Sequence, residues 1–348
     1  MSIVLMGDLS AAAYELWRAQ LSRHLPAHET LTLATQSLDK SGIDIALAAN
    51  PAWGELATYP NLRFVQSLWA GVDRLLGDPS LPADVTLARL IDPAMAQSMA
   101  EGAIAAVLYL HRQFPAYLRQ QHSHTWRQLP QPISAHRKVG VLGFGQMGQP
   151  VARGLAALGF RVGAWGQHAR SESGIESPLG TSPLPAGDVT ATAAPVPRLQ
   201  SPQGTSPLPR LQYSWGAVGL EEVLAETQIL VNLLPLTAAT NGILNATLFD
   251  RLAPGAAVIN FGRGGHLQEG HLLAALQSGR LSHAVLDVFN EEPLPAGHPF
   301  WSHPRITVLP HVAASTDPES AAPIAAQNIA AFRAGRALTG VVSRSLGY

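Results

Sequence analysis

The sequence predicts an α/β fold with two doubly wound parallel sheets, one in each of two domains that enclose a cleft. Apolar runs typical of buried strands alternate with helical patterns along the chain, and this alternation favours parallel sheets. A first series of such elements ends before residue 96, and a second opens at a glycine-rich turn near residue 143. With 348 residues, 47% of them hydrophobic, the chain is long enough to bury two cores.

The first series contains five short strands and one clear helix. The helix is expected from Ala11 to Leu25, and the strands at Ile3–Met6, Leu31–Ala34, Ile43–Ala48, Leu62–Gln66 and Thr86–Arg89. The fourth strand leads into SLWAGVD, residues 67–73, which precedes another helical start. Backbone N–H groups in such a turn can hold a carboxylate, although an ordinary turn before a helix fits these residues equally well.

A long alanine-rich helical pattern then runs from Pro93 to Gln121, and we expect residues 94–120 to link the two domains. The arm that follows carries Trp126, Leu129 and Ile133. These apolar side chains, together with the apolar helix, indicate either a subunit contact in a homodimer or ordinary core packing.

The second series opens with KVGVLGFGQMG, residues 138–148, in which an apolar strand turns through three glycines into a helix. Gly143 permits the tight turn, Gly145 lets the backbone approach a pyrophosphate, and Gly148 lets helix and strand pack closely. The helix N-terminus presents free N–H groups to the anion. The glycines alone are a weak signal, but the strand and helix around them predict a Rossmann domain that binds a dinucleotide.

Further elements complete this second domain. We expect strands at Arg161–Trp165, Ile229–Asn232, Ala257–Asn260, Ala284–Val288 and Ile306–Leu309, and helices near Leu220–Glu226, Leu248–Leu252 and Gln268–Gln277. The last helical pattern, Asp317–Ala334, is expected to return to the first domain, with Ser315, Thr316 or Asp317 as its N-cap. Residues 1–95 and 313–348 are therefore assigned to a flavodoxin-like substrate domain, and residues 96–312 to the cofactor domain.

One segment, residues 177–212, does not share this alternation. It is rich in Pro, Ser, Thr and Gly, and SPLGTSPLP at 177–185 returns as SPQGTSPLP at 201–209. The repeats lack the apolar positions that stacked solenoid units need. We expect a disordered insertion in the cofactor domain, because closing a longer loop costs little more free energy than closing a short one. A proline-rich recognition sequence is the alternative.

Composition restricts the partners. The net charge is −1 and the Lys and Arg residues are scattered, which indicates a small-molecule partner rather than nucleic acid or an acidic membrane. There is no cysteine, so thiolate chemistry and disulfides are excluded. The thirteen histidines form no ligand pattern, and His122 and His124 lie in a polar arm, so no metal is expected. The start MSIVLMGDLS lacks signal-peptide features, and no apolar run reaches about 18 residues, so we expect a cytoplasmic protein.

Three motifs place polar side chains just beyond strands, where ligands of open α/β sheets bind. NFGRGG, residues 260–265, holds Arg263 between glycines, which suits bidentate recognition of a carboxylate. LDVFNEEPLP, residues 286–295, supplies carboxylates. LPHVAAS, residues 309–315, places His311 beyond the last strand, and a histidine paired with a carboxylate is a candidate proton donor to a carbonyl.

GFGQMG, NFGRGG, LDVFNEEPLP and LPHVAAS, in this order and spacing, resemble the D-isomer-specific 2-hydroxyacid dehydrogenase family. With LWAGVD, the arm around Trp126 and the ending GVVSRSLGY, the chain resembles the glyoxylate/hydroxypyruvate reductase A branch, apart from residues 177–212. The resemblance implies that Arg263 orients a 2-oxo acid and polarises its carbonyl. It also implies that His311 gives the proton and that Glu292, rather than Glu291, hydrogen-bonds His311.

The resemblance extends to the ligand contacts. It implies cofactor contacts from Gln146, Met147, Leu234, Pro235, Phe261 and Asp287, in addition to the three glycines, and substrate contacts from Trp69, Ala70, Gly71, Val72 and Trp126. The implied activity is reduction of glyoxylate to glycolate and of hydroxypyruvate to D-glycerate, with hydride from NAD(P)H. The alternative is a non-catalytic dinucleotide-sensing protein on the same fold.

The end of the second strand of the cofactor domain predicts which dinucleotide binds. NAD-using Rossmann sites place an acidic residue about 20 residues beyond the glycines, where it bonds the ribose 2′-OH. Here Gly166 stands at that place, and Arg170, with His168 nearby, suits a 2′-phosphate. We therefore expect NADP to be preferred, with NAD as a possible second cofactor.

Overall fold

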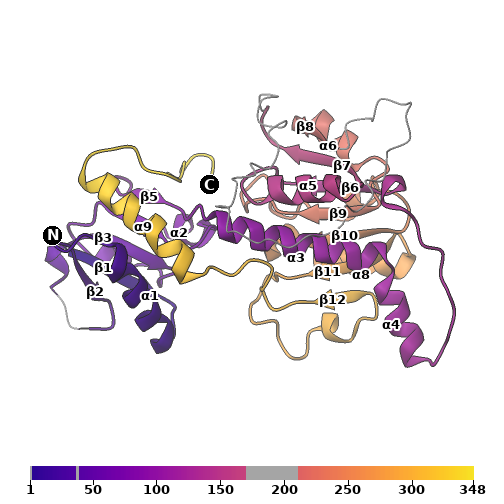
Figure 1. Ribbon diagram of the computed structural model, residues 1–348, viewed down its shortest axis with the longest axis horizontal. Helices are drawn as coiled ribbons and strands as arrows, with labels where there is room; N and C mark the ends of the chain where they lie inside the picture. Colours follow the sequence, from indigo (N-terminus) through magenta and orange to yellow (C-terminus); the bar gives the residue numbers. More distant parts are fainter. Residues whose placement is uncertain (1, 37–38, 170–210) are drawn as a thin grey trace, which may run out of the picture.

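The computed structural model describes residues 2–36, 39–169 and 211–348, which form two α/β units. Helix α3 (Pro93–His111) crosses from the first unit to the second, and the chain returns to the first unit just before helix α9 (Pro318–Arg333) (Figure 1). All strand pairs in both sheets are parallel. The predicted fold class is confirmed.

The first sheet has the strand order β2-β1-β3-β4-β5, which is the flavodoxin-like doubly wound order. Its strands are β1 (Ser2–Gly7), β2 (Thr30–Leu33), β3 (Ile43–Ala49), β4 (Phe64–Ser67) and β5 (Thr86–Ala88). The helices that follow these strands in this unit are α1 (Ala11–His24) and α2 (Asp73–Leu76), with short 3₁₀ turns at Lys40–Gly42 and Leu56–Thr58.

The second sheet has the order β12-β11-β10-β9-β6-β7-β8. Its strands are β6 (Lys138–Leu142), β7 (Arg161–Gly166), β8 (Leu211–Trp215), β9 (Ile229–Asn232), β10 (Ala256–Asn260), β11 (Leu281–Leu286) and β12 (Ile306–Val308). Strand order reverses between β6 and β9, as in a Rossmann fold, and ligands bind at the carboxyl ends of strands beside such a reversal.

Helices cover both faces of the second sheet. They are α3 (Pro93–His111), α4 (Phe114–His122), α5 (Gly148–Ala157), α6 (Gly216–Leu224), α7 (Ala246–Phe249) and α8 (Glu269–Ser278), with 3₁₀ turns at Ser134–His136, Gly264–His266 and Pro299–Ser302. Helix α9 (Pro318–Arg333) belongs to the first unit, where it packs against α1.

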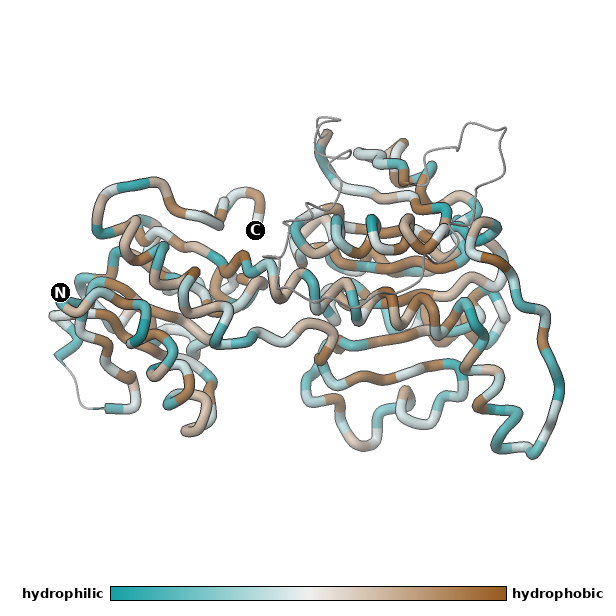
Figure 2. The backbone as a smooth tube through the Cα atoms, viewed as in Figure 1, coloured by the Kyte–Doolittle hydropathy of each residue, from teal (hydrophilic) through white to brown (hydrophobic). Residues whose placement is uncertain are grey.

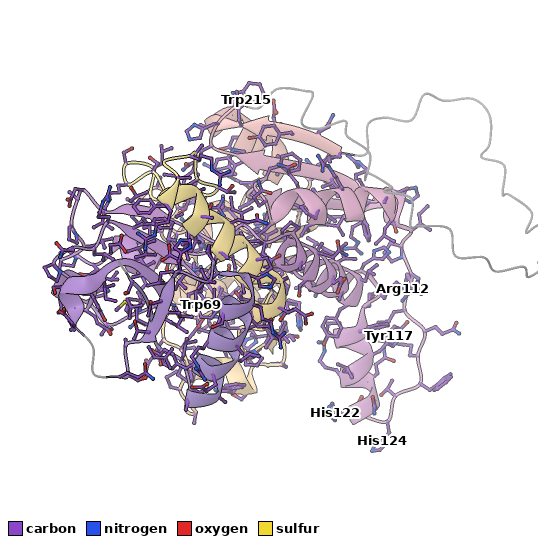
Figure 3. The ribbon with its side chains drawn as sticks, turned by 60° about the vertical axis from the view of Figure 1, so that its left-hand side comes forward. Trp69, Arg112, Tyr117, His122, His124 and Trp215 are labelled. Carbon is purple, nitrogen blue, oxygen red and sulfur yellow. The ribbon has the colours of Figure 1, made fainter. Side chains whose placement is uncertain are left out.

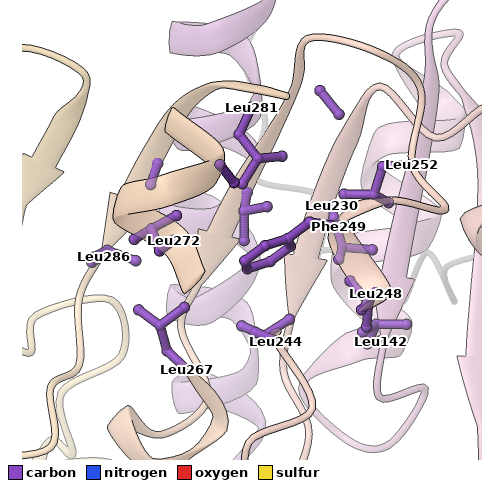
Figure 4. Close-up of a cluster of buried hydrophobic side chains, with 14 of the residues drawn as sticks. Leu142, Leu230, Leu244, Leu248, Phe249, Leu252, Leu267, Leu272, Leu281 and Leu286 are labelled. Atoms are coloured by element: carbon purple, nitrogen blue, oxygen red, sulfur yellow. The ribbon is translucent and has the colours of Figure 1, made fainter. Parts of the chain in front are cut away.

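Successive side chains of the buried strands enter different cores, because they point to opposite faces of the sheet. In β1, Leu5 packs in the core shared with α1 and α9, whereas Val4 packs in the core on the other face. In β6, Val141 packs in the core with α3 and α5, and Leu142 packs with α7 and α8 (Figure 4). Hydrophobic residues accordingly gather along the strands of both sheets (Figure 2).

The C-terminal helix α9 packs on the first unit. Asp317 caps α9 by accepting a hydrogen bond from the backbone N–H of Glu319 at 3.0 Å. At the other end of the helix, Arg333 donates to the buried carboxylates of Glu29 and Asp44, at 2.6 and 2.9 Å. These bonds join α9 to the first sheet and explain why the last part of the chain completes the first unit.

Two predictions about elements are wrong. The expected helix to Gln121 breaks after α3, because Gln113 adopts a left-handed backbone with φ +61° and its side chain donates to the carbonyl of Pro130. The expected insertion does not extend to residue 212, because Leu211 and Gln212 belong to β8 and pair with β7. The rest of that segment, residues 177–210, lies outside the described residues.

Candidate active site

A cleft of about 980 Å³ lies between the two units, at the carboxyl ends of their strands. The predicted residues that line it are Trp69, Ala70, Gly71, Val72, Gly143, Gly145, Gln146, Met147, Gly148, Leu234, Pro235, Phe261, Arg263, Asp287, Glu292 and His311. A separate hollow of about 400 Å³, lined by Lys138 and Arg161 among others, lies at the other end of the strands of the second sheet, and it contains none of the predicted site residues.

The glycine turn between β6 and α5 has the shape that a pyrophosphate needs. Gly143 has φ +97°, and a Cβ there would lie 2.7 Å from the carbonyl oxygen of Leu233. A Cβ on Gly148 would lie 1.7 Å from the carbonyl oxygen of Gly143, so no side chain fits at either position. Gly145 borders open space, which a side chain would fill. The turn therefore fits a dinucleotide phosphate beside the N-terminus of α5.

The end of β7 carries no acidic side chain, and the hydroxyl of Tyr213 lies where one would stand. A Cβ on Gly166 would lie 2.6 Å from the Tyr213 hydroxyl, which comes from β8 and donates to the carbonyl of His168 at 2.5 Å. Gly166, His168 and Tyr213 all line the cleft. Tyr213 thus occupies the space that an aspartate or glutamate would need to reach a ribose hydroxyl from position 166. Arg170 lies outside the described residues.

Arg263 joins the two units. Its Nε donates to Asp73 Oδ1 at 3.0 Å, and its Nη1 donates to the carbonyl of Gly262 at 2.8 Å. Nη2 lies against the 67–73 turn, because a Cβ on Gly71 would be 1.5 Å from it. Asp73 begins α2 in the first unit, whereas Arg263 follows β10 in the second. The guanidinium is therefore fixed by two of its nitrogens and presents the third toward the turn.

His266 is a buried residue that the motifs did not identify, and it holds the backbone of Arg263. Its Nδ1 accepts from the backbone N–H of Arg263 and from the Asn232 amide, both at 3.0 Å. Its Nε2 lies 3.2 Å from the carbonyl of Pro235, which can only accept, so Nε2 carries the proton. Burial lowers the pKa of His266, which keeps this neutral tautomer. The only feature of the sequence that could have indicated this role is the position of His266, three residues after Arg263.

His311 and Glu292 form a direct pair at the mouth of the cleft. Glu292 Oε2 lies 2.7 Å from His311 Nδ1, and Glu292 Oε1 accepts from the backbone N–H of Phe289 at 2.8 Å. Because a carboxylate only accepts, Nδ1 is the donor. Nε2 has no hydrogen-bond partner among the described residues, and 52% of the side chain is exposed. The ring is thus oriented by one nitrogen and available through the other.

The backbone at His311 is strained, and Asp287 holds it. His311 has φ +55°, a left-handed conformation that costs a residue other than glycine roughly 1 to 3 kcal/mol. The buried carboxylate of Asp287 accepts from the N–H groups of Val312 and Ala313, at 2.7 and 3.0 Å. Burial raises the pKa of Asp287, and these two bonds oppose that rise. In this structure Asp287 supports the histidine loop as well as lining the cleft.

The 67–73 turn has the groups expected of an anion site. Ser67 Oγ accepts from the N–H of Trp69 at 3.1 Å and so closes the start of the turn. Within the described parts of the chain, the N–H groups of Ala70 and Gly71 have no hydrogen-bond acceptor. Both residues line the cleft beside Arg263. Free N–H groups next to a guanidinium are suited to a carboxylate.

Comparison with known proteins identifies the family. The model of the NAD-binding domain of D-isomer specific 2-hydroxyacid dehydrogenases matches residues 104–195 and 202–313. Glyoxylate/hydroxypyruvate reductase A of Serratia proteamaculans is 39% identical over 339 residues, which cover 96% of each chain. The chain belongs to the D-isomer specific 2-hydroxyacid dehydrogenase family.

Solved structures of the family agree with this fold. A dehydrogenase of the family from Xanthobacter autotrophicus Py2, in complex with NADPH and MES, is 32% identical and covers 100% of this chain and 99% of its own, with a TM-score of 0.84. An NADPH-dependent glyoxylate/hydroxypyruvate reductase from Sinorhizobium meliloti, in complex with NADP and sulfate, is 34% identical with the same coverage and a TM-score of 0.83.

One residue that the family resemblance assigns to the substrate lies outside the cleft of its own chain. Trp126 is 100% exposed and is absent from the cleft of its own chain. It belongs to the arm, residues 112–137, which projects from the second unit with His122 and His124 near its tip (Figure 3). The Tyr117 hydroxyl accepts from the backbone N–H of Leu129 and from Gln131 Nε2, and Arg112 Nε donates to Gln131 Oε1. These bonds hold the arm in this extended form.

Two features are absent from the residues that the structure describes. No group of three or more His, Asp or Glu side chains within residues 2–36, 39–169 and 211–348 has the arrangement of a metal site. Over the same ranges, no helix combines the length and apolar character needed to cross a bilayer.

Proposed function

We propose that this chain is an NADPH-dependent reductase of small 2-oxo acids, which converts glyoxylate to glycolate and hydroxypyruvate to D-glycerate. The observation that carries the proposal is the convergence of Arg263 and the His311–Glu292 pair on one cleft that also contains the glycine turn. Relatives named glyoxylate/hydroxypyruvate reductase A, 36–39% identical over most of the chain, support the substrate class.

Each residue of the site has its own role in the proposed reduction. Bound NADPH supplies a hydride to the carbonyl carbon. His311 donates a proton from Nε2 to the carbonyl oxygen, and Glu292 stabilises the positive imidazolium that donates it. Arg263 directs its free Nη2 at the oxygen on which negative charge develops. The N–H groups of Ala70 and Gly71 hold the carboxylate.

NADP is preferred over NAD. Position 166 is a glycine, so the chain offers no carboxylate there to bond a ribose 2′-OH or to repel a 2′-phosphate, and Tyr213 would have to move before an acidic side chain could fit. Relatives solved with NADPH or NADP support this preference. We assign Arg170 to the 2′-phosphate, and Gln146, Met147, Leu234, Pro235 and Phe261 to the rest of the cofactor.

The test is NADPH oxidation with glyoxylate and hydroxypyruvate, compared with NADH. We expect a clearly higher kcat/KM with NADPH, and equal values would refute the preference. His311→Ala should lower kcat strongly while the Kd of NADPH stays near the wild-type value. Near-normal turnover by this variant would refute the assignment of His311. No turnover across a panel of 2-oxo acids would favour the dinucleotide-sensing alternative, which is compatible with the Arg263, Glu292 and His311 set but is not favoured by the relatives named as reductases.

We infer that the chain works as a homodimer in the cytoplasm, where NADPH is regenerated. Exposed apolar side chains on the arm, which includes α4, support a subunit contact; they are Phe114, Leu118, Trp126 and Ile133. Sedimentation equilibrium should give twice the chain mass of 36.8 kDa, and a monomer would refute the inference. We keep residues 1–95 with 313–348 as the substrate domain and 96–312 as the cofactor domain, because the cores of the two sheets support this division.

A further inference from the structure

Arg89 lies in the cleft beside the turn that holds the anion site. It directly follows β5, whose Ala88 pairs with Gln66 of β4, so Arg89 stands level with the start of the 67–73 turn. The next residue, Leu90, donates its backbone N–H to the carbonyl of Trp69 at 3.0 Å. Arg89 is half-buried and lines the same cleft as Arg263 and His311. None of the motifs pointed to it.

Two other arginines that belong to this unit, Arg333 and Arg344, have hydrogen-bond partners within the protein. Arg333 bonds two buried carboxylates, and Arg344 donates to the carbonyls of Pro82 and Val85 at 2.8 and 2.9 Å. The guanidinium of Arg89, by contrast, has no hydrogen-bond or ion-pair partner among the residues that the structure describes. Burial without a partner lowers its pKa. A half-buried cation without a counter-ion is costly unless a ligand provides one.

The remaining charges of the cleft are already balanced. Arg263 is paired with Asp73, and His311 with Glu292. Asp287 is satisfied by backbone N–H groups. Of the described arginines that line the cleft, only Arg74 and Arg89 have no partner, and Arg74 is exposed to solvent, which screens its charge. Arg89 is therefore the half-buried positive charge that the protein itself does not compensate.

The C-terminal tail fixes Arg89 from the other side. The backbone N–H of Arg89 donates to the carbonyl of Gly340, and Val342 donates to the carbonyl of Leu87, both at 2.9 Å. The last residue of the tail, Tyr348, lines the same cleft. The backbone that carries the guanidinium is thus bound on both sides, by the tail and by the 67–73 turn, and a positioned group of this kind loses less entropy when it binds a ligand.

We propose that Arg89 is the counter-ion of the substrate carboxylate, which it holds together with the free N–H groups of the 67–73 turn. This inference rests on the proposed function, because it names the anion of the same 2-oxo acid. It also divides the roles of the two arginines. Arg89 binds the carboxylate in ground state and transition state alike, and Arg263 acts on the carbonyl oxygen. Uniform binding of this kind changes KM rather than kcat.

The test compares Arg89→Gln, Arg89→Lys and the control Arg74→Gln, which removes the exposed cleft arginine. For Arg89→Gln we expect KM for glyoxylate to rise about 10- to 100-fold, with kcat and KM for NADPH little changed. Arg89→Lys keeps the charge but not the planar fork, so its KM should lie between wild type and Arg89→Gln. Arg74→Gln should keep a near-normal KM.

Binding of oxamate, an unreactive monocarboxylate analogue of a 2-oxo acid, gives a measurement that does not depend on turnover. Calorimetry with the NADP-loaded protein should show oxamate binding weakened about 10- to 100-fold in Arg89→Gln and retained in Arg74→Gln. An unchanged KM and unchanged oxamate affinity in Arg89→Gln would overturn the proposal, and so would equal losses in both variants. If wild type binds oxamate in an Arg89-dependent manner but reduces no 2-oxo acid, the proposed function fails and the anion site stands. If Arg89→Gln does not fold, Arg89→Lys decides.

Discussion

Replacing Glu292 by glutamine tests how the histidine is controlled, because the substitution keeps the shape and removes the charge. In the wild type, Oε1 accepts from the N–H of Phe289 at 2.8 Å and Oε2 accepts from His311 Nδ1 at 2.7 Å. Glutamine has one oxygen and one NH₂ group, so it cannot accept at both ends. If the oxygen stays at Phe289, the NH₂ group faces Nδ1 and favours the unprotonated Nδ1. If the amide turns round, the N–H of Phe289 loses its acceptor.

The magnitude follows from the bond that is lost. A hydrogen bond to a charged group contributes about 1.5 to 3 kcal/mol, so kcat/KM for glyoxylate reduction should fall about 10- to 100-fold. The Kd of NADPH, measured by fluorescence titration, should remain near wild type, because Glu292 contacts the histidine and not the glycine turn. Glu291→Gln is the matched control, since it removes the same charge from the adjacent exposed residue. Equal losses in the two variants would show that only net charge matters, and would refute the specific pairing.

Two further predictions concern Arg263 and the stability of the second unit. Asp73→Asn keeps a hydrogen bond to Arg263 but removes a charge from a pair that is about one-third exposed (32% and 34%), so kcat/KM should fall only about fivefold, and a loss above a hundredfold would contradict this. His283 is buried against Thr307 and has a pKa of about 4, below its ordinary 6.5. The unfolded chain therefore binds more protons between these values, and urea titrations should show a free energy of unfolding that falls by up to about 3 kcal/mol from pH 6.5 to 4. In His283→Gln that part of the pH dependence should be missing, and an unchanged profile would contradict the assignment.

The parts of the molecule that could be predicted from the sequence depend on local rules. The glycine turn is specified by steric limits within six residues, at Gly143 and Gly148, so its conformation followed from the residue types. Arg263 and His311 lie directly after strands of a parallel sheet, and such positions meet at one edge. This rule alone predicts that both side chains lie at the cleft.

The parts that could not be predicted depend on distant contacts. The helix break has one local signal, Pro115 in the first turn of α4, but the bond from Gln113 to the carbonyl of Pro130, 17 residues away, could not be predicted from it. Strand β8 follows a Pro-rich repeat and is a strand because β7 offers it an edge. His266 becomes important only through Asn232 and Pro235, which lie on another strand end. The position of Trp126 depends on the direction of the whole arm.

The charges of the cleft predict that small monocarboxylates are preferred as substrates. Arg263 is paired with Asp73 and His311 with Glu292, so the wall offers one half-buried positive charge, that of Arg89, to a ligand. One carboxylate balances that charge. A second carboxylate on the substrate would lose its hydration and find no unpaired positive charge in the cleft, or it would have to separate Arg263 from Asp73. Either step costs free energy. The hydroxyl of hydroxypyruvate carries no charge and so incurs no such cost. If Arg89 is the counter-ion, we therefore expect kcat/KM to be higher for glyoxylate and hydroxypyruvate than for dicarboxylic 2-oxo acids, and equal values would contradict this charge argument.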